Sequence, residues 1–359
     1  MKKFLAAILA LCMIFALAAC GSSSAPAESA PASSGSEAAP AASDNEASAS
    51  AGAPIEISWC CHTATGWHEK TMQRFIQNLK DAVGEDRVVE TYYTAGTMGS
   101  ETELSQAVIL DDLTMSIPAD SFNLPNIGVP DWTSIPGIVT SREEAFNILL
   151  NEDAPLNQYI EKQFEEGGII RLGGLDNGFR CIATSKPCET LADLQGLKTR
   201  VANSWGMVAL YNGVGLQSTI IDSSEVISAL QQGTIDAVEN GLVNLVNQGY
   251  ADLLDKCLAV NFVYSTRSMI CNKAWFDALA PADQEAVRAA AREATDWCNE
   301  QFGNDYQAAL DDPRWTVVEL SDEQYEAFKA SAAEALKLAY DNCNAADVDY
   351  IKEVTGLGA

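Results

Sequence analysis

One arginine of this sequence lies where it could bind a carboxylic acid. Arg200 belongs to residues 197–201, a short run that predicts a β-strand. A guanidinium on such a strand offers a rigid fork of N–H donors that matches a carboxylate in two parallel hydrogen bonds. Asn203 follows three residues later with an amide that both donates and accepts hydrogen bonds. The alternative is an arginine that is ion-paired or exposed at the surface.

The composition argues against several other chemistries. The chain has 359 residues, with 50 acidic against 22 basic side chains and a formal charge of −28. This charge opposes nucleic-acid binding, which depends on clustered basic residues. The two histidines, His62 and His68, are six residues apart, on different faces of any helix that holds both, and no nucleophile elbow, P-loop or H-E-x-x-H motif occurs. We therefore expect no enzyme activity, no cofactor and no metal site.

The N-terminal segment predicts export. Two lysines precede an apolar run over residues 4–16, which is shorter than the roughly 20 residues that a membrane-spanning helix needs. We predict a signal peptide over 1–19, because Leu-Ala-Ala-Cys ends at Cys20 and resembles the bacterial lipobox. The resemblance implies that Cys20 carries lipid, palmitate included, and holds the protein at the cell membrane on its extracytoplasmic side. Residues 20–53 are rich in Ser, Ala and Pro and predict a tether.

The remainder predicts an α/β fold. Short β-like runs alternate with amphipathic helical patterns, which is typical of this class. Capping boxes at Ser100 and Ser141 mark helix starts. The strands are expected over residues 55–60, 87–93, 169–172, 179–184 and 197–201, and long helices over 282–310 and 322–343.

Eight cysteines follow Cys20, and their pairing is open. A chain of this length can fold without disulfides, and buried thiols pack as small apolar groups. The pairs to test are Cys181 with Cys188 and Cys298 with Cys343.

Two segments resemble motifs of one protein family. Residues 177–204 contain N-G-F-R, T-S-K-P and L-A-D-L-Q-G-L-K-T-R-V-A-N-S, and residues 229–240 read A-L-Q-Q-G-T-I-D-A-V-E-N. Both segments, and the forty-residue spacing from Arg200 to Asn240, resemble the solute-binding proteins of tripartite ATP-independent periplasmic (TRAP) transporters. Looser matches extend the resemblance over nearly all of 54–359.

The resemblance implies roles for several polar residues. In the family, the arginine that matches Arg200 contacts the substrate carboxylate. Asn203 and Asn240 match pocket positions and are expected to hydrogen-bond the same carboxylate or a neighbouring hydroxyl; the alternative for both is an asparagine that stabilises a turn. Arg180 also matches a family arginine, and it either pairs with a second anionic group of the ligand or braces Glu239.

The chain departs from the family at one informative position. Ser223 stands where many members place an aromatic ring against the ligand, so a more polar or wider pocket is expected, which favours a hydroxylated acid. Phe262, near the hinge, is a candidate for an aromatic wall instead. On the opposite lobe, Thr65 and Glu101 are candidates for ligand contacts by position.

The fold implied by the resemblance is a two-lobe α/β type II periplasmic-binding-protein-like fold with a hinge, a cleft and long C-terminal helices. We expect lobe I over 54–177 plus 266–305 and lobe II over 178–265 plus 306–359.

The implied function is capture of a small organic acid by lobe closure. The ligand is a dicarboxylate, a sugar acid or a related carboxylate, delivered to the small and large integral membrane subunits of an ion-coupled TRAP permease. The alternative is a lipid-anchored sensor or receptor ectodomain of the same fold. An extracytoplasmic hydrolase ranks third, because the sequence offers no nucleophile with a positioned base.

Overall fold

The computed structural model describes residues 52–355, apart from the side chains of residues 205, 331–336 and 338–340. Every element below belongs to one unit of the chain, Ala51–Ala359. The predicted signal peptide, Cys20 and nearly all of the predicted tether lie outside the described residues. Within the described part, no helix combines the length and apolar character needed to span a bilayer.

The elements follow one another as an α/β alternation. The strands are β1 (Ile55–Trp59), β2 (Val88–Tyr92), β3 (Met115–Ser116), β4 (Ile169–Thr184), β5 (Lys198–Val201), β6 (Gln217–Ile220), β7 (Ala237–Gly241), β8 (Lys256–Ala259), β9 (Tyr264–Asn272) and β10 (Thr316–Glu319). The α-helices are α1 (His68–Val83), α2 (Glu101–Ile109), α3 (Asp120–Asn126), α4 (Arg142–Ala145), α5 (Pro155–Glu166), α6 (Trp205–Gly213), α7 (Val226–Gln231), α8 (Leu242–Asn247), α9 (Lys273–Ala278), α10 (Pro281–Leu310), α11 (Asp322–Asn342) and α12 (Ala345–Thr355). Shorter helical turns are η1 (Glu85–Arg87), η2 (Trp132–Ser134), η3 (Phe146–Leu150), η4 (Leu191–Leu194), η5 (Ser223–Glu225) and η6 (Tyr250–Asp252).

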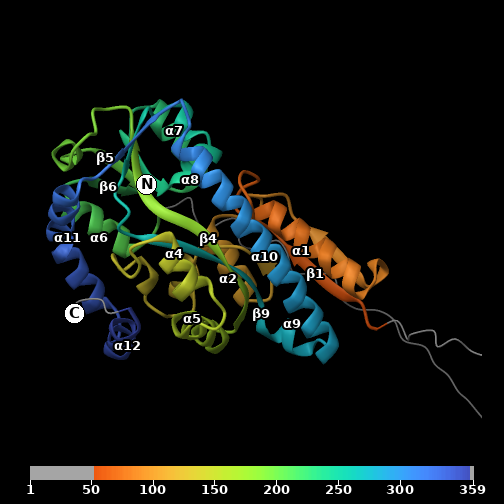
Figure 1. Cartoon of the computed structure of the whole chain (residues 1–359). Helices are drawn as coiled ribbons and strands as arrows, with labels where there is room; N and C mark the ends of the chain where they lie inside the picture. The colour runs from red at the N-terminus through yellow and green to blue at the C-terminus, as the bar shows by residue number, and fades with distance from the viewer. Residues whose placement is uncertain (1–51, 356–359) are drawn as a thin grey trace, which may run out of the picture. The chain divides into compact units, whose positions relative to one another are not determined.

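A mixed sheet forms the framework of the folded unit (Figure 1). Its main path is β2-β1-β3-β9-β4-β7-β5-β6, and β8 and β10 extend it from β4. β1 is parallel to β2 and β3, and β5 is parallel to β6 and β7, whereas β9 is antiparallel to β3 and β4. Parallel neighbours connected through helices are the arrangement that the α/β pattern of the sequence predicts.

Strand β4 joins the two halves of the sheet. Its first part pairs with β9, and its last part, from Arg180 to Thr184, pairs with β7. The register with β9 shifts between Asp176 and Phe179, where Gly178 has a φ of +72°. We call β1, β2, β3, β9 and the first part of β4, with α1–α5, lobe I, and the remaining strands, with α6–α8, lobe II. The predicted two-lobe α/β fold is confirmed.

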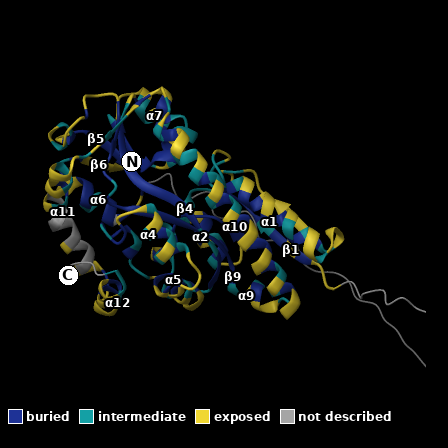
Figure 2. Ribbon diagram, viewed as in Figure 1, coloured by how far each residue is buried: buried dark blue, intermediate teal, exposed yellow. Residues whose placement is uncertain are grey.

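Helix α10 packs along α1 and β4 and reaches α8, so it contacts both lobes (Figure 1). The side that it buries carries small residues, Ala290, Ala291 and Ala294, which let it approach the sheet closely. On β4, a Cβ added to Gly173 would lie 2.7 Å from the Thr295 hydroxyl oxygen. The central strands β4, β7 and β9 are buried almost throughout, whereas α1 and α10 turn exposed residues outward (Figure 2).

The prediction of two strands over 169–172 and 179–184 is wrong, because both belong to the single strand β4. The intervening glycines suggest a break in the sequence. In the structure, Gly173 instead makes room for the neighbouring helix, so the strand continues through it.

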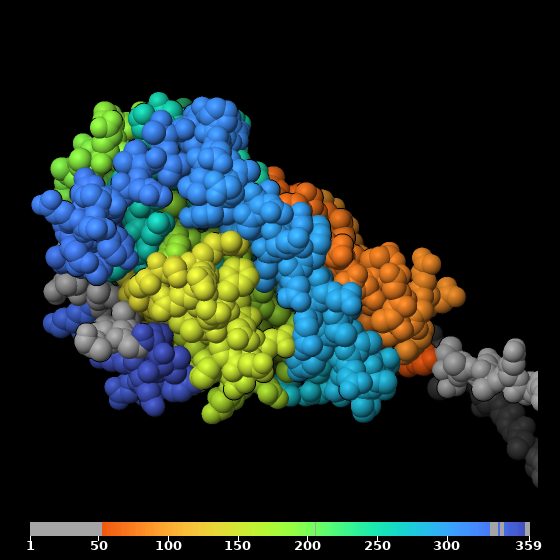
Figure 3. Space-filling model, viewed as in Figure 1, coloured from red at the N-terminus to blue at the C-terminus, as the bar shows by residue number. Residues whose placement is uncertain are grey.

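The helices predicted over 282–310 and 322–343 form as α10 and α11, and the last two helices of the described chain, α11 and α12, contact different lobes. α11 packs against α6 of lobe II. α12 packs against α5, where the Tyr350 hydroxyl donates to the Pro155 carbonyl oxygen at 2.9 Å. The sequence assignment gives all of 306–359 to lobe II, whereas α12 lies on lobe I beside the α4–α5 region (Figure 3).

All eight cysteines of the described residues are buried and free. Cys181 and Cys188 belong to different core clusters, and so do Cys298 and Cys343. Neither of the two disulfides considered from the sequence is present, because each thiol packs among apolar side chains of a separate cluster.

Candidate solute-binding site

A pocket of about 150 Å³ lies between the two lobes. Lobe I contributes Ser100, Glu101, Thr102 and Phe122, and lobe II contributes Arg200, Asn203, Ile220, Ile221, Asp222 and Ser223. Four of these residues are among those predicted from the sequence, namely Glu101, Arg200, Asn203 and Ser223.

The capping box of α2 positions the lobe I wall of the pocket. The Ser100 amide donates to the Glu103 carboxylate at 2.7 Å, and the Glu103 amide donates to the Ser100 hydroxyl at 3.4 Å. The box fixes the start of the helix, so Glu101, its first residue, faces the pocket.

Strand β5 positions Arg200 in the lobe II wall. The backbone of Arg200 pairs with Thr219 on one side and Val238 on the other, so its strand is held from both edges. The side chain is 6% exposed. Its Nε donates to the Ile221 carbonyl oxygen at 2.8 Å and its Nη1 to the Glu239 carbonyl oxygen at 3.4 Å.

The guanidinium of Arg200 has no carboxylate partner among the described residues, and its Nη2 has no hydrogen-bond acceptor there. Burial lowers the pKa of Arg200, an effect that the Glu239 charge opposes, yet the group stays charged at neutral pH. A buried cation with only neutral carbonyl partners can bind a carboxylate without first losing an ion pair.

Arg180 differs from Arg200 in its partners. It is 5% exposed and forms a two-point ion pair with Glu239, with Nη2 donating to Oε2 at 2.8 Å and Nε to Oε1. Although burial alone lowers the pKa of Arg180, the Glu239 carboxylate raises it above its usual value. Neither residue lines the pocket, so Arg180 braces Glu239, which was one of the two roles considered from the sequence.

Glu101 is held by an ion pair within lobe I. Arg267 donates from Nη1 to Oε2 at 2.5 Å and from Nη2 to Oε1 at 3.2 Å, and the Ala119 amide donates to Oε2 at 2.9 Å. Burial raises the pKa of Glu101, but Arg267 and the neighbouring His62 outweigh it, so the pKa lies well below the usual range. The carboxylate is therefore ionised, and its charge is matched by Arg267.

The two histidines lie beside this ion pair. Their ring centroids are 5.1 Å apart, and His62 Nε2 lies 3.4 Å from Glu101 Oε1. The argument from helical faces does not apply, because α1 begins at His68 and His62 precedes it in a loop. Burial lowers the pKa of His62 to about 4 and lowers the pKa of His68 well below its usual value, so both are neutral at pH 7. The described residues hold no cluster of three or more potential metal ligands.

Three further predicted residues, Phe262, Asn240 and Thr65, do not line the pocket. Phe262 packs edge-on against Phe328, with ring centroids 5.0 Å apart, inside the core of lobe II. This large apolar ring gains more by burial in the core than it would at a wet cleft. The side-chain Oδ1 of Asn240 accepts from the Gly241 amide at 2.9 Å, and Thr65 is exposed, with its hydroxyl 2.8 Å from the Thr63 hydroxyl.

Sequence reasoning missed six of the ten lining residues, and two of the six, Phe122 and Asp222, add an aromatic ring and a charge. Phe122, from α3, supplies the aromatic surface that was expected from Phe262. Asp222 precedes Ser223 and places a carboxylate at the pocket, and Ser224 donates to its Oδ1 from the amide at 3.0 Å and the hydroxyl at 2.8 Å. The position of Asp222 beside a predicted residue was the available signal, whereas nothing near Phe122 in the sequence marked it.

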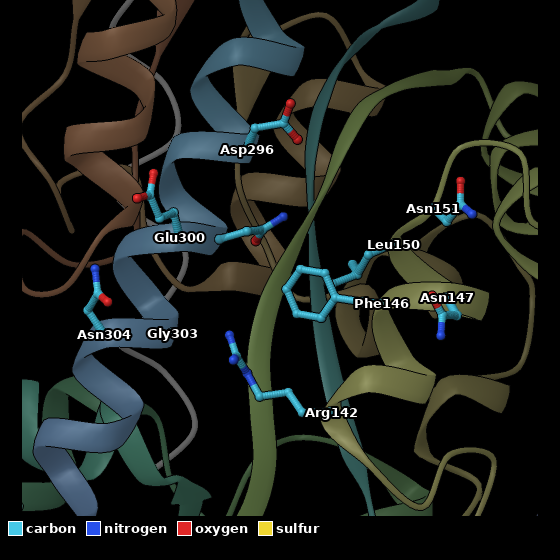
Figure 4. A pocket seen from close by; sticks show the side chains of 10 residues that line it. Arg142, Phe146, Asn147, Leu150, Asn151, Asp296, Glu300, Gly303 and Asn304 are labelled. Atoms are coloured by element: carbon cyan, nitrogen blue, oxygen red, sulfur yellow. The ribbon is translucent and has the colours of Figure 1, made fainter.

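A larger hollow of about 700 Å³ lies elsewhere, between α10 and the segment α4–η3 (Figure 4). Its cation, Arg142, is already paired with Asp176 through Nε at 2.7 Å and Nη2. Phe146 from η3 and Asp296 and Glu300 from α10 face the same hollow. None of the predicted site residues lines it, and its only cation is committed to an internal carboxylate.

A small pocket between two lobes of one α/β sheet, lined by a buried arginine without a carboxylate partner, is the architecture of a protein that binds small solutes. The sequence agrees: residues 62–342 match the model of the family described as bacterial extracellular solute-binding protein, family 7. The chain therefore belongs to this family, which includes the solute-binding proteins of TRAP transporters.

Individual relatives agree with this membership. A solute-binding protein of Verminephrobacter eiseniae is 32% identical over 68% of this chain and 72% of its own length. The 2,3-diketo-L-gulonate-binding periplasmic protein of Escherichia coli is 28% identical over 47% of this chain, a match that spans only 52% of that relative. A TRAP periplasmic solute-binding protein from Sulfitobacter, solved with bound β-D-galacturonate, has the same fold, with a TM-score of 0.77 at 21% identity over 84% of this chain and 99% of its own.

Proposed function

We propose that the protein captures a small organic acid by a contact between Arg200 and the ligand carboxylate. The observation that carries this proposal is the buried guanidinium of Arg200, which lines the pocket with only carbonyl oxygens as partners. Relatives named for 2,3-diketo-L-gulonate and C4-dicarboxylates, and solved relatives with bound galacturonate and galactonate, support an acid as the ligand. Asn203 and Ser223 add polar groups on the same wall.

Lobe closure completes the site, because the pocket takes its walls from both lobes. The proposed lobes are 54–177 plus 266–305 and 178–265 plus 306–359, except that α12 (Ala345–Thr355) packs on lobe I. Beside the pocket, the Ser204 hydroxyl of lobe II donates to the Asp131 carboxylate of lobe I at 3.0 Å. A ligand that touches both walls favours the closed form, because only differential affinity can shift such an equilibrium.

The captured acid is delivered to the membrane subunits of an ion-coupled TRAP permease, and the protein is held outside the membrane by lipid on Cys20. Family membership supports the first step, and the lipobox and tether of the sequence support the second. Replacing Cys20 by alanine should move the full-length protein from the membrane fraction to the soluble fraction. If the protein stays with the membrane, the anchor is not at Cys20.

A thermal-shift screen of residues 54–359 against monocarboxylates, dicarboxylates and sugar acids tests the capture step. A ligand at about 100 times its dissociation constant adds roughly 2.7 kcal/mol of apparent stability. We expect one acid class to raise the melting temperature of the native domain and not of Arg200→Ala. Lys198→Ala, which removes an exposed cation from the same strand, is the matched control and should behave as the native domain.

If acids stabilise Arg200→Ala as much as the native domain, the arginine contact is wrong. If no acid binds, mass spectrometry of the small molecules released on denaturation decides whether the domain was purified already loaded. A released acid would support the proposal, and a domain that is empty and indifferent to every acid would overturn it.

A further inference from the structure

The charges that face the pocket bear on which acids can bind, and this step rests on the function proposed above. Arg200 is the one cation among the pocket-lining residues, and no carboxylate partners it. Arg267 is committed to Glu101 and Arg180 to Glu239, so neither adds free positive charge. The pocket can therefore pair one ligand carboxylate with a positive charge.

Asp222 adds a negative charge that no cation of the described residues pairs with. Its Oδ1 accepts from Ser224, and its Oδ2 has no hydrogen-bond partner among residues 52–355 as far as they are described. The lobe I wall adds the carboxylate of Glu101, which is ionised and matched by Arg267. His62 is neutral at pH 7 and brings no compensating charge.

We propose that the pocket selects hydroxylated monocarboxylates against dicarboxylates, with Asp222 and Glu101 as the specificity-determining residues. The ligand carboxylate binds Arg200, and hydroxyl groups on the rest of the ligand donate to the carboxylate oxygens of Asp222 and Glu101. A second carboxylate on the ligand has no hydrogen to donate to Asp222 and Glu101, and their negative charges would repel it. Two such negative charges about 6 Å apart, at an effective dielectric constant of about 40, repel each other enough to weaken binding of the dicarboxylate roughly tenfold.

The test uses pairs of acids with one carbon skeleton, in which a terminal hydroxymethyl group is replaced by a second carboxylate. L-Threonate with L-tartrate and D-gluconate with D-glucarate are two such pairs, measured by calorimetric titration of residues 54–359. We expect each monocarboxylate that binds to do so at least tenfold more tightly than its dicarboxylate partner. Raising the salt concentration should lower this difference in affinity, because dissolved ions screen the repulsion between the second carboxylate and the pocket acids.

The Asp222→Asn variant tests the effect of the Asp222 negative charge, because it removes the charge and keeps the shape of the side chain. It keeps the oxygen that accepts from Ser224, and the side chain is exposed, so the fold is not at risk. In this variant, the ratio of monocarboxylate affinity to dicarboxylate affinity should fall several-fold. Glu225→Gln, which removes an exposed acid of the same turn outside the pocket, is the control and should keep the native ratio.

The outcomes separate the two proposals. If the dicarboxylates bind as well as the monocarboxylates, or if Asp222→Asn and Glu225→Gln give the same ratio, the specificity proposal fails while acid capture stands. If no acid of either kind binds and the domain carries no released acid, the proposed function itself fails.

Discussion

Arg180 and Arg200 stand on strands of the same lobe, and both are buried, but they differ in what they touch. Arg180 is matched by the Glu239 carboxylate, and Arg200 meets only carbonyl oxygens. The two members of a buried ion pair neutralise each other, whereas a buried cation without a counter-ion can still pair with an anion from outside. Burial alone therefore does not distinguish a binding residue from a bracing one, and the partner does.

The largest expected effect is on the stability of an Arg180→Met variant. Removing one member of a buried ion pair leaves Glu239 charged and unpaired, which costs about 3–5 kcal/mol of unfolding free energy. Denaturant unfolding measures it. Adding Glu239→Gln to the same chain should recover much of the loss. If Arg180→Met stays stable but no longer binds acid, the assignment of the two arginines is reversed.

Arg200→Met should have the opposite profile. The unliganded domain should be as stable as the native one or more so, because no carboxylate loses its partner and a buried charge is removed. Acid affinity should fall on the order of 100-fold, since hydrogen bonds to charged groups contribute roughly 1.5–3 kcal/mol each. Calorimetric titration beside Lys198→Met measures it. A loss of stability comparable to that of Arg180→Met would show that Arg200 braces the lobe.

His62 extends the comparison of the two buried arginines, because it is a buried basic side chain that is uncharged at pH 7. Its pKa in the folded state is about 4, against an ordinary value of 6.5, so the unfolded chain takes up the proton first as the pH falls. Stability from this group is complete above pH 6.5 and is lost as the pH falls toward 4, with about 2 kcal/mol lost between pH 7 and 5.

Unfolding free energies measured from pH 7 to 5 check this, with His62→Gln as the variant that removes the titrating group. The unfolding free energy should change less with pH in the variant than in the native protein. Equal slopes in the two proteins would mean that His62 does not contribute to the pH dependence.

The smallest effect is expected at the larger hollow. Asn147→Ala changes its lining without touching Arg142 or the pocket between the lobes. Acid affinity should stay within about twofold of the native value. A loss of binding in this variant would move the candidate site to the hollow beside α10.

The sequence predicts more of the fold than of the pocket. Element boundaries follow from local signals, and the capping box at Ser100 and the long C-terminal helices are where the pattern predicts them. The family resemblance adds the two-lobe arrangement. The split of β4 fails because glycine has two uses, to break a strand or to admit a neighbouring helix, and only the packed structure selects between them.

The pocket depends on which side chains find partners, and partners come from distant segments. Arg180 and Arg200 look alike in the sequence, and the pairing of Arg180 with Glu239 is a property of the folded sheet. Phe262 and Phe122 are likewise both aromatic, and the core of lobe II takes the first while the cleft receives the second. Asp222 was one position from a predicted residue, but its meaning depends on the charges that face it.

The buried thiols have a practical consequence for observing the cleft. All eight cysteines of the described residues are at most 8% exposed, and burial raises the pKa of Cys298 to about 12 and that of Cys343 to about 11. Thiolates are the reactive form, so maleimide dyes should leave these positions unlabelled in the native domain. One cysteine introduced on each lip, at Thr102 and Asn203, would then carry a fluorophore pair without background. Such a pair would report the opening and closing of single molecules directly.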